Sequence, residues 1–211
     1  MKILAVSDEP VSWIYSPQML ERCSDVDLVI SCGDLPFSYL EYIASTLNRP
    51  CYYVRGNHDH QEISDHGPTK TAPEGWIDID ASVMKQGSIT LAGLEGCLRY
   101  RPHAEAQYSQ RDQWLRVLRM APQMLLRRPV LFVAHAPPFG IHNGPDHAHT
   151  GFHVYNWVIA KFQPHIFLHG HQHRNYNPRQ TGDTFVGRTH VINVHPYRIL
   201  NLPNLPNEPG F

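Results

Sequence analysis

Six polar side chains that can bind metal ions lie where five short apolar runs of this chain end. In order along the sequence they are Asp8, Asp34, Asn57, His135, His171 and His173. Buried strands read as apolar runs of this length. In open α/β sheets, ligands bind beyond the carboxyl ends of the strands, so we expect these side chains to share one crevice.

The donor types favour a centre that holds two divalent transition-metal ions. Carboxylate and amide oxygens together with imidazole nitrogens suit Mn, Fe, Zn or Ni better than Ca. The two oxygens of Asp34 allow it to bridge two cations about 3.5–4 Å apart. Such a pair lowers the pKa of a bound water from about 15.7 toward ~7 and clamps the oxygens of an in-line displacement.

A histidine with a different task lies between two of these positions. If Asn57 faces a metal, the ring of His58 can face the substrate, and Asp59 could hold that ring and raise its basicity. A protonated His58 could stabilise developing charge or protonate the leaving oxygen. The alternatives are that His58 is a further metal ligand or a solvated loop residue.

The bulk properties predict one globular domain that spans residues 1–211. The chain has 211 residues, 42% of them hydrophobic, which is enough for a sizeable core. A net charge of −1 gives no strong signal for nucleic acid, and no apolar stretch approaches the roughly 20 residues of a membrane span. The four cysteines form no Cys-x-x-Cys pair, so we expect reduced thiols and a cytoplasmic protein. Nothing indicates an oligomeric state.

Periodicity and turn residues predict an α/β fold. The expected strands are residues 2–6, 28–32, 51–54, 130–134, 166–169 and 190–194, and the expected helices are residues 17–22, 37–47, 105–118 and 154–162. The βαβαβ opening favours a parallel sheet. Segments 76–80, 82–86 and 89–92 are expected to be antiparallel strands of a second sheet. We expect Pro122 to end or kink the third helix, and the proline-rich tail from Pro196 to lack regular structure.

Four motifs of the chain resemble the signature blocks of the calcineurin-like metallophosphoesterases, in the order that this family has. They are Gly33-Asp34, Gly56-Asn57-His58-Asp59, His135 and Gly170-His171-Gln172-His173. The resemblance extends from Asp8 to His173 and is to the small single-domain type of bacteria and archaea. It implies a four-layer fold, in which a two-sheet mixed β-sandwich is flanked by helices, with a dinuclear metal site at the strand ends.

The resemblance also implies a role for each motif residue. Asp34 would bridge the metals, the set Asn57, His135 and His171 would complete one site, and Asp8 and His173 would belong to the other. His58 would be the catalytic histidine, oriented by Asp59. The implied reaction is hydrolysis of a phosphodiester or a phosphomonoester by a metal-bridging hydroxide. The partner would be a small phosphoester substrate, with a nucleotide as one candidate.

The chain departs from the family pattern after the first strand. The family usually opens with Asp-x-His, and that histidine is a ligand of the first metal, whereas this chain has Asp8-Glu9-Pro10. Water, Glu9 or a histidine from elsewhere could supply the missing donor. Side chains alternate at a strand end, which directs Glu9 away from Asp8, so we expect a vacant or water-filled position.

The loop after His135 supplies two candidate substrate-binding residues. Small relatives carry a similar His-x-Gly on the substrate side, which here corresponds to His149 and Gly151, and Asp146 precedes them. A polar, solvated loop is the alternative interpretation. We expect His169 to lie at its strand end, behind the metal ligands.

A metal-binding protein-interaction scaffold of the same fold, with reduced or lost catalysis, is the main alternative function. The proline at position 10 favours it, because one metal site is a donor short. His58 and the full donor set of the other metal favour an enzyme, since a scaffold needs neither. A metallo-β-lactamase-like hydrolase would need a His-x-His-x-Asp-His sequence, which the chain lacks.

Overall fold

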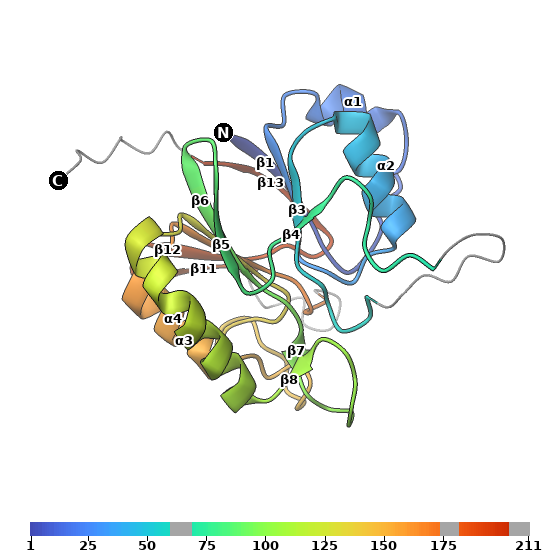
Figure 1. Cartoon of the computed structure of the whole chain (residues 1–211). Coiled ribbons are helices and arrows are strands. Elements are labelled where there is room, and N and C mark those ends of the chain that lie inside the picture. Colours follow the sequence, from blue (N-terminus) through green and yellow to red (C-terminus); the bar gives the residue numbers. More distant parts are fainter. Residues whose placement is uncertain (60–68, 174–181, 203–211) are drawn as a thin grey trace.

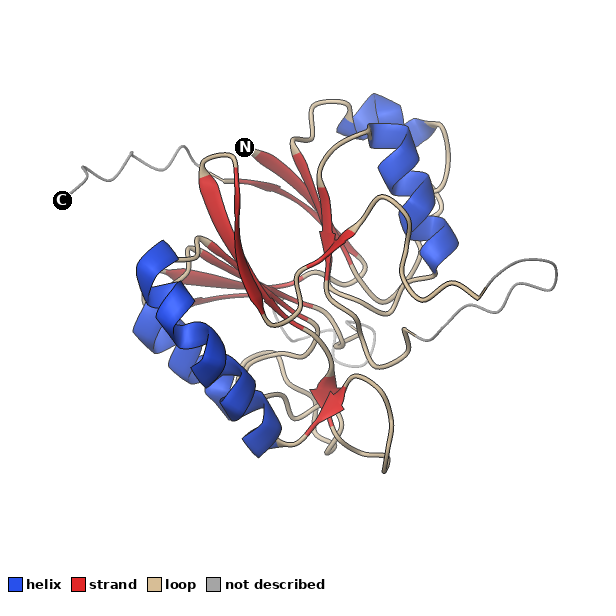
Figure 2. Cartoon of the chain, in the orientation of Figure 1, coloured by secondary structure: helices blue, strands red, loops and turns tan. Residues whose placement is uncertain are grey.

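Two mixed sheets make up the framework of the computed structural model, which describes residues 1–59, 69–173 and 182–202 (Figure 2). The first sheet contains β1 Lys2–Val6, β2 Leu28–Ser31, β3 Cys51–Tyr53, β4 Ile77–Asp78 and β13 Tyr197–Asn201. The second contains β5 Ser82–Gln86, β6 Ile89–Leu94, β9 Leu131–Ala134, β10 Ile166–His169, β11 Asp183–Val186 and β12 Thr189–Asn193. A separate small sheet pairs β7 Cys97–Leu98 with β8 Gln107–Tyr108.

Helices cover the outer face of each large sheet. They are α1 Gln18–Cys23, α2 Phe37–Leu47, α3 Gln110–Arg127 and α4 His153–Phe162. The first two pack on the first sheet and the last two on the second (Figure 1). The order is β13-β1-β2-β3-β4 in one sheet and β11-β12-β10-β9-β6-β5 in the other. The expected two-sheet sandwich flanked by helices is therefore confirmed.

The central strands are apolar on both sides because each side faces a core. In β1, Ile3 and Ala5 point into the core between the sheets, whereas Leu4 and Val6 point toward α1 and α2. The strands β9 and β10 alternate in the same way between this core and the one under α3 and α4. Buried parallel strands therefore read as continuous apolar runs, which is why their positions could be predicted.

The strand order brings the predicted ligands to one edge. β1, β2 and β3 run parallel in the first sheet, and β6, β9, β10 and β12 run parallel in the second. The observed bounds of β1, α2 and β10 equal the predicted ones, those of β2, β3 and β9 differ from them by one residue at one end, and β12 is shifted by one residue at both ends. None of the helices within the described residues is long and apolar enough to cross a membrane.

The prediction for residues 76–80 is wrong in both direction and sheet. β4 joins the edge of the first sheet and runs parallel to β3, with Tyr52 opposite Ile77 and Tyr53 opposite Asp78. Segments 82–86 and 89–92 do form the expected antiparallel pair, as β5 and β6 of the second sheet. Because β4 has two residues, both exposed, its sequence carries no alternation that could identify a partner.

The third helix begins later and ends later than predicted. α3 starts after Ser109, which forms a capping box with Asp112, and it continues through Pro122 to its last residue. Pro122 is exposed, so water can bind the Leu118 carbonyl that the proline leaves without an N–H. Two leucines of this helix, Leu115 and Leu118, are exposed. The buried side of α3 consists of Gln113, Val117, Met120 and Met124.

The segment after Pro196 forms a strand, contrary to the expectation of an irregular tail. β13 pairs antiparallel with β1, from Lys2 opposite Asn201 to Val6 opposite Tyr197. The segment contains no proline, so it keeps the N–H groups that the edge of β1 requires. Residues 203–211, with the later prolines, lie outside the described residues.

We expect Phe132→Ala to lower the free energy of unfolding by about 3–5 kcal/mol. The Phe132 ring is fully buried and stacks on Phe167, with ring centroids 5.0 Å apart. Urea unfolding followed by circular dichroism measures the change. Leu126→Ala on the solvent side of α3 is the matched control, and we expect it to alter stability by less than about 0.5 kcal/mol. Equal losses in the two variants would contradict the role of Phe132 in the core.

Candidate metal centre

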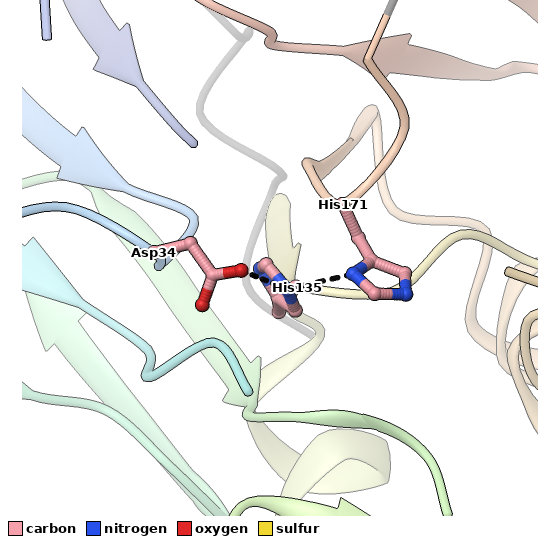
Figure 3. Close-up of side chains that lie close together, drawn as sticks. All are labelled: Asp34, His135 and His171. Atoms are coloured by element: carbon pink, nitrogen blue, oxygen red, sulfur yellow. Dashed lines mark hydrogen bonds and ion pairs between the residues drawn. The ribbon is translucent and has the colours of Figure 1, made fainter. Parts of the chain in front are cut away.

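The loops that follow the central strands are joined to one another through their backbones. The Asp8 N–H donates to the Gly33 carbonyl (3.0 Å), and the Gly170 N–H donates to the His135 carbonyl (2.9 Å). Among the described residues, three side chains from these loops bring their ligand atoms within 4.8 Å of one another: Asp34, His135 and His171. Figure 3 shows the three side chains pointing toward a common centre.

The Nε2 atom of His135 lies in the middle of this group. It is 3.1 Å from Asn57 Oδ1, 3.1 Å from His171 Nδ1 and 3.4 Å from Asp34 Oδ2. The His135 ring is fully buried, so bulk water does not separate these atoms. The strand ends of β2, β3, β9 and β10 therefore each contribute one polar atom to a single point.

Backbone carbonyls hold the ring protons on the side away from this centre. His135 Nδ1 donates to the Cys32 carbonyl (2.7 Å), and His171 Nε2 donates to the Ala148 carbonyl (3.1 Å). Because a carbonyl can only accept, each ring in its neutral form must keep the proton there and a lone pair toward the centre. Metal-binding histidines are commonly oriented by an outer acceptor of this kind.

The amide of Asn57 is oriented by the same principle. Its Nδ2 donates to the hydroxyl of Tyr100 (3.2 Å), which leaves the carbonyl oxygen facing His135. Together with the two inner histidine nitrogens and an oxygen of Asp34, this makes four atoms that point lone pairs at one another and, in the neutral rings, carry no hydrogen to donate. A cation satisfies such a set, and mixed nitrogen and oxygen donors suit a divalent transition metal.

The pKa values of His135 and Asp34 also indicate that a positive charge is favoured at the centre. Burial alone would lower the pKa of His135, but the facing Asp34 carboxylate outweighs it and raises the pKa to about 9. Burial would conversely raise the pKa of Asp34, yet His135 holds it below its usual range. The centre therefore requires a positive charge, which either a proton on His135 Nε2 or a metal ion can supply.

Two glycines leave room for the ligand side chains. A Cβ on Gly56 would lie 2.0 Å from Asp34 Oδ1 and 2.7 Å from His135 Cε1. A Cβ on Gly170 would lie 1.9 Å from Ser7 Oγ and 2.7 Å from an oxygen of Asp8. The glycines at positions 56 and 170 therefore allow the loop backbones to approach the ligands of neighbouring loops.

The backbone is strained at three of the candidate ligands. Asp8, Asp34 and His171 have φ angles of 66°, 58° and 63°, in the left-handed region. Each such residue costs roughly 1–2 kcal/mol when it is not glycine. Strain of this kind persists where the surrounding structure imposes it, and it clusters at functional sites.

The predicted ligands of the other metal lie outside the compact group. Both oxygens of Asp8 accept the His171 N–H (2.9 and 3.1 Å), and burial raises the Asp8 pKa. The ring of His173 faces that of His195, with centroids 4.6 Å apart. His195 was not among the expected site residues, because it follows a strand without a recognisable motif.

The two predicted catalytic residues lie beside the centre but do not act on each other as expected. The ring of His58 is exposed, and the backbone N–H of His58 donates to Asp34 Oδ1 (2.7 Å). The Asp59 carboxylate accepts the N–H groups of Asp34 (2.9 Å), Leu35 (3.0 Å) and Gly56 (2.7 Å). Among the hydrogen bonds of the described residues, none joins the Asp59 carboxylate to the His58 ring, so Asp59 ties together the loops after β2 and β3.

The predicted substrate-binding loop contacts a candidate ligand directly. The ring of His149 stacks on that of His171, with centroids 4.6 Å apart and an interplanar angle of 23°. His149 Nδ1 donates to the Asp146 carboxylate (2.7 Å), and the Ala148 carbonyl of the same loop accepts from His171. The loop therefore braces the ring of His171, and its contact with a substrate stays a prediction.

A second pair of histidines lies behind the centre. His142 Nδ1 is 2.9 Å from His169 Nε2, and His142 Nε2 is 2.8 Å from the hydroxyl of Thr184. Burial lowers the pKa of both rings, to about 4 for His142 and about 3 for His169. His169 was expected at this strand end, whereas the partnership with His142 could not be read from a sequence separation of 27 residues.

A cavity of about 630 Å³ lies next to the metal centre. It is lined by residues 99–104 and by His147. Tyr100 links the two sites, because its hydroxyl accepts the hydrogen bond from the Asn57 amide. His147 Nε2 donates to the Arg99 carbonyl (3.0 Å), which joins the loop after β9 to the cavity wall.

The comparisons with known proteins agree with this geometry. Residues 1–175 match the family model described as calcineurin-like phosphoesterase. The fold is similar to TT1561 of Thermus thermophilus, with 16% identity, a TM-score of 0.59, and coverage of 92% of this chain and 88% of that one. It is also similar to the phosphopantetheinyl hydrolase PptH of Mycobacterium tuberculosis, with 15% identity, a TM-score of 0.57, and coverage of 99% and 98%. Curated proteins gave no significant sequence match.

We expect Gly56→Ala to weaken Mn²⁺ binding by about 10–100-fold, the size of effect seen when the support of a metal ligand is lost. The added Cβ would displace Asp34 or His135. Isothermal titration calorimetry measures the affinity. Gly87→Ala is the control. Gly87 has a φ of +57° and no atom within 4 Å of an added Cβ, so this variant should strain the backbone locally and leave the Mn²⁺ affinity unchanged. Unchanged Mn²⁺ binding in Gly56→Ala would contradict the tight packing of the centre.

Proposed function

Because the chain belongs to the calcineurin-like phosphoesterase family, we propose that it hydrolyses a small phosphoester, either a diester or a monoester, at a centre of two divalent metal ions. The observation that carries this proposal is the convergence of lone pairs from Asp34, Asn57, His135 and His171. The metal ions, when bound, would acidify a water molecule and neutralise charge on the phosphate oxygens. Mn, Fe, Zn and Ni all fit these donors.

The ligand roles in this proposal are those that the resemblance to the family implies, and the way in which the side chains are held supports them. Asp34 is the bridging ligand, since Oδ2 faces His135 while the His58 N–H fixes Oδ1. Asn57, His135 and His171 complete the compact site. Asp8 and His173 belong to the second site, on the side of β1.

His58 is the proposed general acid. Its exposed ring follows Asn57 in the sequence, so it can reach a substrate that approaches the metal centre from solvent. A proton delivered to the leaving oxygen from this position would avoid expulsion of an alkoxide. Asp59 is a positioning residue in this scheme, because its carboxylate fixes the loops that carry Asp34 and His58.

The cavity beside Tyr100 supports a substrate with a second anionic or polar group. Two arginines contribute to its wall, Arg99 and Arg101. The Arg99 guanidinium already pairs with Asp112 (3.1 Å), whereas that of Arg101 lies over the Tyr100 ring, 5.4 Å from its centroid. A nucleotide fits this chemistry. A phosphopantetheinyl ester is a further candidate, since a solved structure of similar fold is a phosphopantetheinyl hydrolase.

We expect the Mn²⁺-loaded chain to hydrolyse at least one member of a panel of phosphodiesters and phosphomonoesters that includes nucleotides and a phosphopantetheinyl ester. His58→Ala should lower kcat by about 10²–10⁴-fold, because the leaving oxygen loses its proton donor. Asp34→Asn should lower kcat by at least about 10²-fold, because a neutral amide is a poor bridge between two cations. Initial rates over a range of substrate concentrations measure both effects.

The controls for this experiment separate catalysis from metal loading. His58→Ala should keep the metal content of the wild type, whereas Asp34→Asn should lose metal, as measured by elemental analysis. His190→Ala, at the opposite end of β12 from the centre, should keep full activity. Full activity of His58→Ala on the best substrate would refute its catalytic role. Absence of metal-dependent hydrolysis across the panel would favour the protein-interaction scaffold.

We expect Arg101→Ala to raise KM about 10-fold for substrates that carry a second negative group, with little change in kcat. Loss of a contact that is equally strong in the ground state and the transition state has this kinetic signature. Arg119→Ala is the matched control, since Arg119 is an exposed arginine of α3 that does not line the cavity. Steady-state kinetics give the KM for a nucleotide and for a phosphoester whose leaving group carries no charge. A KM that is unchanged for both substrates would exclude Arg101 from substrate binding.

A further inference from the structure

The end of β1 offers one metal donor fewer than the family pattern has at this place. Asp8 is the donor there, and Pro10 occupies the position where the family pattern has a second one. The proposed site beside Asp8 therefore contains two carboxylates, of Asp8 and Asp34, and the imidazole of His173. A divalent transition metal in a catalytic site usually has at least three protein ligands and often a further nitrogen donor.

His195 is brought to this place by the second sheet. β12 runs parallel to β10, with Asn193 opposite His169, so His195 and His171 each lie two residues beyond a paired position. Parallel strands end at the same edge of a sheet. The loop after β12 thus reaches the same crevice as the loop that carries His171 and His173.

The ring of His195 lies between the two loops that carry the ligands of this site. On one side, its centroid is 4.6 Å from that of His173. On the other side, its Nε2 is 3.5 Å from a carboxylate oxygen of Glu9, the residue after Asp8. The residue is only 3% exposed, although its partner Glu9 has a side chain that is 58% exposed. Nε2 therefore points from the buried side toward the end of β1.

Hydrogen bonds fix the backbone of His195 relative to both loops. Its N–H donates to Asn193 Oδ1 (3.1 Å), and Asn193 Nδ2 donates to the Gln172 carbonyl (2.8 Å), between the two histidines of the motif. The Ser7 N–H donates to the Pro196 carbonyl (3.0 Å), which ties the following residue to the end of β1. The ring is thus positioned before any ligand arrives, which lowers the cost of binding.

We propose that His195 supplies the nitrogen donor that Pro10 cannot, and that it binds the metal held by Asp8 and His173. The inference rests on the proposed two-metal centre. It replaces the expectation of a vacant or water-filled position with a protein ligand from the segment after β12. Glu9 is a neighbour of this ligand, with a carboxylate oxygen 3.5 Å from its Nε2.

Mn²⁺ binding tests this assignment without recourse to activity. The metal-free chain is titrated with Mn²⁺, and free Mn²⁺ is measured by its electron paramagnetic resonance signal. The wild type should bind two ions per chain. His195→Phe keeps a ring of similar size but removes the nitrogen, so it should retain one tight ion and bind the second about 100-fold or more weakly, beyond the range for loss of an outer contact.

Three further variants define the comparison. His190→Ala, a histidine at the other end of the same strand, should bind two ions like the wild type. Glu9→Gln should also keep two ions, because the Glu9 carboxylate is a neighbour and not a ligand. Pro10→His combined with His195→Phe should recover the second ion, since it restores a nitrogen donor after β1. Circular dichroism confirms that each variant is folded, and His195→Ala replaces His195→Phe if the larger ring disturbs packing.

The outcomes distinguish this inference from the proposed function. Two ions of wild-type affinity in both His195→Phe and His195→Ala would overturn the role of His195 alone. Loss of the second ion in Glu9→Gln, with His195→Phe unaffected, would assign the position to Glu9 and would also overturn it. A wild-type chain that binds a single Mn²⁺ would refute the two-metal centre and His195 with it.

Discussion

The rest of this structure depends on the accumulation of unshared electron pairs at one point beyond the strand ends. The outer nitrogen of His135 donates to the Cys32 carbonyl, and that of His171 donates to the Ala148 carbonyl. In the neutral rings, the inner nitrogen of His135 then faces Asn57 Oδ1, the Asp34 carboxylate and the inner nitrogen of His171 with no hydrogen between them. Lone pairs at such distances repel one another unless a positive charge lies among them. The centre is therefore stable only as a place for a cation or a proton.

The surrounding backbone is shaped by this requirement. The chain adopts left-handed φ angles at Asp8, Asp34 and His171, each directly after or close to a strand end. Each angle is unfavourable for a residue with a side chain, yet each turns a donor toward the crevice. The Asp59 carboxylate offsets part of this strain by accepting three N–H groups from the loops after β2 and β3. Apolar cores on both faces of each sheet hold the strands, and with them these loops, in place.

The part of this arrangement that could be predicted from the sequence is the part encoded locally. Strands β1, β9 and β10 are buried on both faces, so each appears as an apolar run, and a polar residue after such a run marks a strand end. That logic located Asp34, Asn57, His135 and His171, which the fold brings together. The third helix continues through Pro122, where an end or a kink was predicted, because the effect of a proline depends on whether the helix face around it is exposed.

The elements that escaped prediction depend on partners far away in the sequence. β4 has two exposed residues, and β13 is recognised only by the free edge of β1 that it covers. The same holds for side chains: His142 meets His169 across 27 residues, and the apolar stretch before His195 gives no hint of the loop that its ring faces. A motif search identifies donors that are close in sequence, whereas these histidines are placed by the sheet.

The geometry of the sheets makes the two proposed metal sites unequal in a way that has a chemical consequence. The donors of the compact site have their tautomers and orientations fixed by backbone carbonyls and by Tyr100, so little order is lost when a metal binds. The proposed site beside Asp8 would draw its donors from the ends of β1, β10 and β12, and Asp8 itself accepts the backbone N–H of His171. A metal that binds Asp8 must compete with that hydrogen bond. Its binding is most favourable once a metal in the compact site holds His171 in place. The compact site should accordingly fill first. Because parallel strands end at a common edge, a donor that β1 does not provide can come from β12 without any change in the fold.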